Sequence, residues 1–303
     1  MSHRIDQRCF ELGCTTPLKL LDFLVVWSTI GPSKSGVVVS ATASARPVLA
    51  FRNFSLRCDK SNPQVIFETP WNWDFGHGKR IAVISKNYFL RYQLSACMAG
   101  LVPSASGEIL GNSVIGWPVG GDGGLDKKMR ISHAVNFLST VYADCLDQSC
   151  VSLKQFWGLM SDFGIDPSSI IKELSKEQRD FFFLALSVLF AFDCYLIPKV
   201  KFLMSRPASP LRALLLEQVQ GRMLFATAAN VRFQREFCTD GIVLGASGQI
   251  LFAGEILNAI QWADDNLASS NESESEENDF DINFNLTNSE AAGDEIDDLE
   301  AWG

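Results

Sequence analysis

The chain has 303 residues, 47% of them hydrophobic, and a formal net charge of −9. This apolar content excludes a wholly disordered chain, because it suffices for one large core or two smaller ones. The charge is unevenly spread: 14 of the 35 acidic residues lie from Asp264 onward, where no Lys or Arg occurs, which leaves 26 basic and 21 acidic residues before that point. The sequence therefore predicts a mildly basic body with a strongly acidic tail.

The N-terminal third predicts a mixed region. Residues 1–60 favour a β-rich or irregular lobe, and residues 79–85 read as a strand followed by a helix over residues 88–101. Residues 107–124 hold seven glycines and a Trp-Pro pair, which is typical of a loop or a boundary between lobes. We expect residues 1–110 to form an irregular α/β region.

From Leu125 the apolar spacing predicts helices. The predicted fold class is mainly α, with an all-α bundle over residues 111–268 and a disordered acidic tail over residues 269–303. In the first helix the pattern places Met129, His133, Phe137 and Val141 on the apolar face, with Leu138 and Tyr142 beside them. The expected helices cover residues 126–146, 152–160, a segment opened by Asp166-Pro167, 175–204, 211–237 and 255–267, with a Gly-rich break over residues 239–247.

The stretch from residue 175 to residue 204 is the expected centre of the core. Residues 181–192 carry no charge, so a helix there must be surrounded on all sides by protein or lipid. Ser175 and Gln178 form a capping-box spacing, and Pro198 predicts a stop or kink. The apolar run is short for a bilayer span and contains Asp193, so a buried helix is favoured over a membrane-associated one. No membrane span is predicted.

The sequence supplies no clear catalytic or metal site. The eight cysteines predict reduced, packed thiols, because no pair has a His or Cys partner at zinc-ligand spacing. His133, on the predicted apolar face, reads as a core residue rather than a base. The glycine cluster of residues 116–124 lacks a Gly-Lys-Ser/Thr ending and reads as a connector, not a phosphate loop. We expect no catalytic residue, metal or cofactor.

The acidic tail carries bulky apolar residues that favour docking onto a basic partner surface, although a merely solubilising tail stays open. Ser269, Ser273 and Thr287 each precede a Glu by three residues, which suits an acid-directed kinase. The predicted tail anchors are Phe280, Ile282, Phe284 and Trp302.

Several residues together resemble the NSs non-structural proteins of phleboviruses. Trp117-Pro118-Val119-Gly120 is similar to an element ahead of the helical core of that family, and residues 192–198 and 202–204 are similar to the end of a core helix. The acidic, aromatic-bearing tail completes the pattern, which spans residues ~110–303. The resemblance implies a helical, self-associating virulence factor that suppresses the type I interferon response.

The resulting hypothesis is a non-enzymatic viral interferon antagonist in the host cytoplasm and nucleus. Its expected partners are host transcription, translation or innate-signalling proteins and a second copy of itself, with Trp117, Pro118 and Gly120 as a further protein-binding element. The alternative is a basic helical RNA-binding protein with an autoinhibitory tail, whose salt-sensitive RNA affinity would mark it. It is less favoured, because the arginines of residues 206–235 form no tight stripe. An unrecognised enzyme is the third hypothesis.

Overall fold

The computed structural model describes residues 49–59, 62, 64 and 66–267, all within the unit Ala45–Gly303. The fold of these residues is mixed α/β, so the expectation of a mainly α bundle is wrong. Two β-sheets, one of five strands and one of three, form its framework.

The five-stranded sheet has the order β5-β6-β3-β7-β8. Its first four strands run parallel, and β8 pairs with β7 in the antiparallel direction. The central strand is thus β3, which lies between β6 and β7. The strands are β3 (Arg80–Ile84), β5 (Cys194–Ile197), β6 (Met223–Ala226), β7 (Asp240–Leu244) and β8 (Ile250–Glu255).

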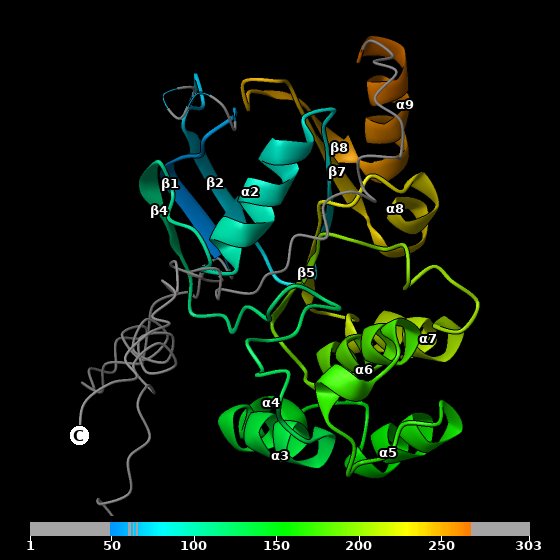
Figure 1. Cartoon of the computed structure of the whole chain (residues 1–303). Coiled ribbons are helices and arrows are strands. Elements are labelled where there is room, and N and C mark those ends of the chain that lie inside the picture. Colours follow the sequence, from blue (N-terminus) through cyan, green and yellow to red (C-terminus); the bar gives the residue numbers. More distant parts are fainter. Residues whose placement is uncertain (1–48, 60–61, 63, 65, 268–303) are drawn as a thin grey trace, which may run out of the picture. The chain divides into compact units, whose positions relative to one another are not determined.

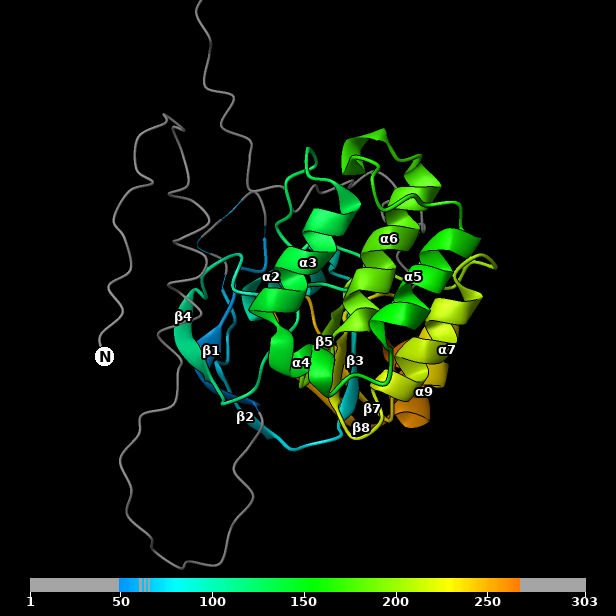
Figure 2. The same ribbon diagram turned by 90° about the horizontal axis from the view of Figure 1, so that it is seen from below.

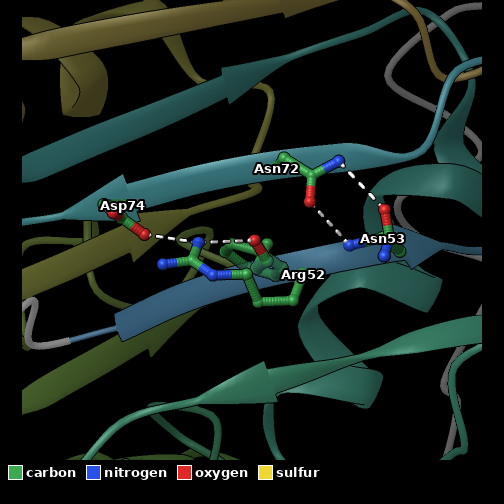
Figure 3. Close-up of polar contacts among 5 residues, drawn as sticks. Arg52, Asn53, Asn72 and Asp74 are labelled. Carbon is green, nitrogen blue, oxygen red and sulfur yellow. Dashed lines mark hydrogen bonds and ion pairs between the residues drawn. The ribbon is translucent and has the colours of Figure 1, made fainter.

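The three-stranded sheet is antiparallel, with β1 (Leu49–Ser55) between β2 (Trp71–Phe75) and β4 (Ser106–Leu110). Its register shifts at Asn53, which has a positive φ of 48°. The Asn53 backbone N–H donates to Asn72 Oδ1 at 2.9 Å, and Arg52 forms an ion pair with Asp74, also on β2 (Figure 3). The bulge is therefore held by side chains of the neighbouring strand.

The helices lie in separate regions around the sheets. Figures 1 and 2 both show α3, α4, α5, α6 and α7 together, while α2 lies near the three-stranded sheet. The helix α9 packs against β7 and β8. The helices are α2 (Tyr88–Met98), α3 (Ile131–Val141), α4 (Ala143–Asp147), α5 (Leu153–Asp162), the 3₁₀ helix η1 (Ile171–Glu173), α6 (Lys176–Leu189), α7 (Ser209–Gln218), α8 (Val231–Phe237) and α9 (Ile256–Asn266).

The core lies on both faces of the five-stranded sheet, because alternate side chains of a strand point to opposite faces. Ile81 and Val83 of β3 pack with α2 and the small sheet, whereas Ala82 between them packs with the cluster that contains α6. Strands β5 and β6 are split between the two clusters in the same way. Parallel strands buried on both faces are continuously apolar, as these are.

The central prediction for residues 175–204 is half confirmed. The capping box of Ser175 and Gln178 is present, and α6 is buried from Phe181 to its end. The helix stops at Leu189, however, and Cys194–Ile197 forms strand β5. No helix in the described part of the chain is long and apolar enough to cross a membrane.

The predicted helix over residues 211–237 is wrong. It is divided into α7, strand β6 and α8. The expected Gly-rich break after it is in fact β7, whose residues from Gly241 to Leu244 are all buried. Asp166-Pro167 opens no α-helix; the Asp166 carboxylate accepts hydrogen bonds from the backbone N–H and hydroxyl of Ser168 in a turn.

The predicted helix over residues 126–146 exists as α3 and α4, but its predicted apolar face is only partly correct: Leu138 is buried, and Met129 and Tyr142 pack against the core. The buried residues of α3 are Ile131, Ala134, Val135 and Leu138. Phe137 and Val141 are exposed, as is His133, so His133 is no core histidine.

Several other elements agree with the sequence analysis. The strand β3 and the helices α2, α5 and α9 lie where they are predicted, and the capping box of Ser152 and Gln155 opens α5. The proposed division at residues 110 and 268 stays a prediction. The predicted disorder of residues 269–303 lies outside the described residues.

Candidate functional site

The site that the topology singles out is the turn between β3 and α2. In open sheets with parallel strands, ligands bind beyond the carboxyl ends of the strands, and a helix N-terminus there attracts anions. The strand β3 is central, and α2 begins four residues after Ile84, at Tyr88. The turn consists of Ser85, Lys86 and Asn87.

Asn87 is the residue that organises this turn. As the N-cap of α2, its Oδ1 accepts from the Leu90 backbone N–H at 3.0 Å. Its Nδ2 donates to the Cys58 carbonyl at 2.7 Å and to the Ala246 carbonyl at 3.2 Å. Ser85 Oγ, which is buried, accepts from the Asn87 N–H at 3.2 Å. One side chain thus joins three distant segments over the start of the helix.

Arg91, one turn into α2, is buried with 8% of its surface exposed. Its Nη1 donates to the Thr227 carbonyl, directly after β6, at 2.9 Å, and its guanidinium carbon lies 5.6 Å from the centre of the Tyr88 ring. A buried charge requires such partners. The Arg91 side chain therefore links the start of α2 to the carboxyl end of the neighbouring strand.

The residues that follow the other parallel strands carry no carboxylate. Pro198 and Lys199 follow β5, residues 227–230 (Thr-Ala-Ala-Asn) follow β6, and residues 245–249 (Gly-Ala-Ser-Gly-Gln) follow β7. No group of three potential metal-binding side chains occurs among the described residues. This edge of the sheet is thus lined by hydroxyl, amide and basic groups.

The predicted Trp117–Gly120 element lies elsewhere, along the free edge of β5. Gly116 N–H donates to the Cys194 carbonyl and Val119 N–H to the Leu196 carbonyl, at 2.9 and 2.8 Å. Trp117 Nε1 and the Gly120 N–H both donate to Ser187 Oγ of α6 at 3.1 Å. Pro118 is buried. These contacts anchor the loop to the core, and its role in protein binding stays a prediction.

The described thiols are held in their neutral form. Burial raises the pKa of Cys97 and of Cys145 to about 11, and it raises the pKa of Cys194 further. A protonated thiol is a poor nucleophile. Cys150 is the exposed residue among the described cysteines. Partial desolvation of its thiol nevertheless raises its pKa.

The remaining predicted site residues lie outside the described residues, so their roles stay predictions. They are Phe280, Ile282, Phe284 and Trp302 as anchors and Ser269, Ser273 and Thr287 as phosphorylation sites.

A comparison with solved structures identifies the architecture. The structure of an ATP-binding subunit of an ABC transporter superposes with a TM-score of 0.52, covering 74% of this chain and 95% of that subunit, at 15% sequence identity. The described residues have the ABC ATP-binding subunit fold.

Sequence comparison points to the same class, although no family model matches the chain. The polysialic acid transport ATP-binding protein KpsT of Escherichia coli is 26% identical over 189 residues, 61% of this chain and 84% of that protein. The ATP-binding protein BexA of Haemophilus influenzae is 25% identical over 174 residues (57% and 78%). The capsule polysaccharide export ATP-binding protein CtrD of Neisseria meningitidis serogroup B is 24% identical over 168 residues (55% and 76%).

These findings overturn the functional hypothesis drawn from the sequence. The relatives are bacterial transport proteins, so the identification as a phlebovirus NSs protein, the interferon antagonism and the nucleoprotein alternative are wrong. The predicted host signalling partners and the predicted location in the host cytoplasm or nucleus are therefore also wrong. The expectation of a non-enzymatic class is also wrong, because the fold and the relatives are those of ATP-binding subunits, a class of ATPases.

Sequence reasoning missed the β3–α2 turn although it predicted both flanking elements. The glycine cluster of residues 116–124 was the candidate for a phosphate loop in the sequence, but Gly116 and Val119 of this segment pair with β5. The available signal was a predicted buried strand followed within four residues by a helix with an Asn N-cap. The absence of glycine from residues 79–99 hid that signal.

Proposed function

We propose that the protein is a subunit of a bacterial ABC-type polysaccharide export system, in the position that an ATP-binding protein holds in such a system. The observation that carries this proposal is the similarity to KpsT, BexA and CtrD, which extends over at least 76% of each relative. The shared ABC ATP-binding subunit fold supports it independently. The expected partner is a membrane-embedded subunit of the exporter.

The helix α3 offers a surface for that partner. Phe137 and Val141 are 37% and 40% exposed, and their spacing of four residues puts them on one side of the helix. Neither side chain supports the core. We expect them to contact the membrane-embedded subunit, since exposed apolar side chains gain free energy when an interface covers them.

The test is co-expression of the tagged, full-length chain with the membrane-embedded subunits of a polysaccharide exporter from its own genome. Recovery of those subunits with the tag, and loss of surface polysaccharide when the gene is deleted, would support the proposal. The double variant F137S/V141S should weaken recovery, while K128S, an exposed control before α3, should not. Absence of co-purification together with unchanged polysaccharide export would contradict the proposal.

A further inference from the structure

The start of α2 raises the question of whether it can receive a nucleoside triphosphate, the ligand that the ABC fold implies. A phosphate loop has the pattern G-x-x-x-x-G-K-[S/T], in which glycines let the backbone approach the phosphates and the lysine reaches the terminal ones. When the first glycine is placed at Ser85, directly after β3, the second falls on Leu90, the lysine on Arg91 and the hydroxyl residue on Tyr92.

The residues at the two glycine positions do not let the backbone approach a phosphate. Leu90 is fully buried among the apolar side chains of the α2 cluster, so its side chain is part of the core. Ser85 is also buried, and its hydroxyl is engaged by the Asn87 N–H. A phosphate nest needs free backbone N–H groups that converge on the anion. At this turn those of Asn87, Leu90 and Arg91 are taken by Ser85 Oγ, Asn87 Oδ1 and the Asn87 carbonyl.

The space above the helix start is spanned by the protein itself. The Asn87 amide reaches from the helix cap to the Cys58 and Ala246 carbonyls, which belong to two other segments. An incoming phosphate would meet carbonyl oxygens at this point, and the repulsion between these oxygens and an anion opposes binding.

The cation at the lysine position is directed elsewhere. Arg91 is buried and donates to the Thr227 carbonyl at 2.9 Å. Swinging its guanidinium toward a phosphate would break this hydrogen bond and leave the carbonyl after β6 without it. A buried, hydrogen-bonded arginine resists such a movement because the groups left behind lose their partners.

A divalent cation that accompanies a triphosphate would find no carboxylate among the described residues that follow the parallel strands. Magnesium in phosphate-loop proteins is held by the loop hydroxyl and by the aspartate of the Walker B motif. The hydroxyl position is Tyr92, and Pro198 and Lys199 follow β5 in place of a carboxylate. The ammonium group of Lys199 is a charge of the wrong sign for a metal site.

From these contacts we infer that the β3–α2 turn of this subunit is closed by its own side chains, Asn87 and Arg91, and does not accept a magnesium–nucleoside triphosphate. The inference rests on the proposed function for the choice of ligand. The inference concerns this one turn and does not alter the similarity of fold and sequence to ATP-binding proteins.

The experiment is equilibrium dialysis of the full-length protein against magnesium and radiolabelled ATP up to millimolar concentration, with KpsT of Escherichia coli as the positive control. Thermal unfolding with and without magnesium–ATP gives a second readout, because a bound ligand raises the unfolding temperature. We expect no saturable binding and no shift in unfolding temperature for this protein, and both for KpsT.

Variants decide what any observed binding means. Saturable binding that is lost in R91A, or in K86A at the exposed turn position, would overturn the inference, since the nucleotide would then lie at this turn. K86A keeps the test valid if R91A does not fold. Saturable binding that both variants retain would place the nucleotide elsewhere and agree with a closed turn. Co-purification with the membrane-embedded subunits is measured separately, so failure of the proposed function is recognised independently.

Discussion

At the scale of single residues, close contacts leave no room for a side chain at two glycines, Gly107 and Gly116. Gly107 in β4 has a φ of +69°, and a Cβ there would lie 2.2 Å from the Asn53 carbonyl oxygen. Gly116 is confined differently, because a Cβ would lie 2.5 Å from the Phe192 ring. Both glycines are therefore required by packing rather than by a ligand.

The substitution G107A tests this argument. We expect it to lower the free energy of unfolding by about 1–3 kcal/mol, since it forces strain or a shift of the β1 bulge. Urea unfolding measures the change. The control is G76A, whose Cβ would meet no atom within 4 Å; equal losses in both variants would contradict the explanation.

The buried thiols predict a dependence of stability on pH. The Cys97 thiol ionises at a pKa near 9 when exposed and at about 11 in the folded protein. Above about pH 9 the unfolded chain therefore binds fewer protons than the native one, so this thiol lowers the free energy of unfolding as the pH rises from about 9 to about 11. Below about pH 9 it contributes no pH dependence.

Urea unfolding at about pH 8 and about pH 10 checks this prediction. The wild-type protein should lose more stability between the two values than C97A does, because the variant lacks the titrating group. Identical losses in the two proteins would show that Cys97 is not the source.

At the scale of elements, the sequence predicted those with strong local signals. The caps at Ser152 and Ser175 were read correctly because the capping box is a pattern within four residues. The strands β5, β6 and β7 were missed because a strand that is buried on both faces does not alternate between apolar and polar residues. A short apolar run of this kind has the same pattern as a segment of a buried helix. Pairing with β3, which lies over a hundred residues earlier, decides the conformation of β6 and β7, and β5 in turn pairs with β6.

The apolar face of α3 shows the same limit and gives a prediction. A helical pattern with apolar residues on two sides does not state which side meets the core. L138A should cost about 2–5 kcal/mol, because Leu138 is 2% exposed, whereas F137A should change the stability by about 0.5 kcal/mol or less. Chemical denaturation of the two variants measures this, and the reverse order would contradict the burial of Leu138 and the exposure of Phe137.

At the scale of the whole molecule, composition indicated the size of the core but not its architecture. A content of 47% hydrophobic residues agrees with a large core, yet it is equally compatible with a bundle of helices and with a layered sheet. The β3–α2 site depends on long-range strand order. The local sequence predicts the strand and the helix on either side of this turn, but it does not state that β3 is the central strand.

The strand order predicts where backbone amides are most protected. Hydrogen exchange followed by mass spectrometry should be slowest in β3 and β6, which are paired on both sides and buried on both faces. The edge strand β2 and strand β4, whose side chains are mostly exposed, should exchange faster. Faster exchange in β3 than in β4 would contradict the assigned sheet.

The network around Asn87 and Arg91 also determines which substitutions would convert this turn into a phosphate loop. A phosphate loop at this turn would need glycine at positions 85 and 90, lysine at 91, a small hydroxyl residue at 92 and an acidic residue that holds magnesium. The single substitution R91K would remove the hydrogen bond from the Arg91 guanidinium to the Thr227 carbonyl, and it would supply none of the other features. A phosphate loop at this turn would therefore require several simultaneous substitutions, and the lysine alone is expected to destabilise the turn.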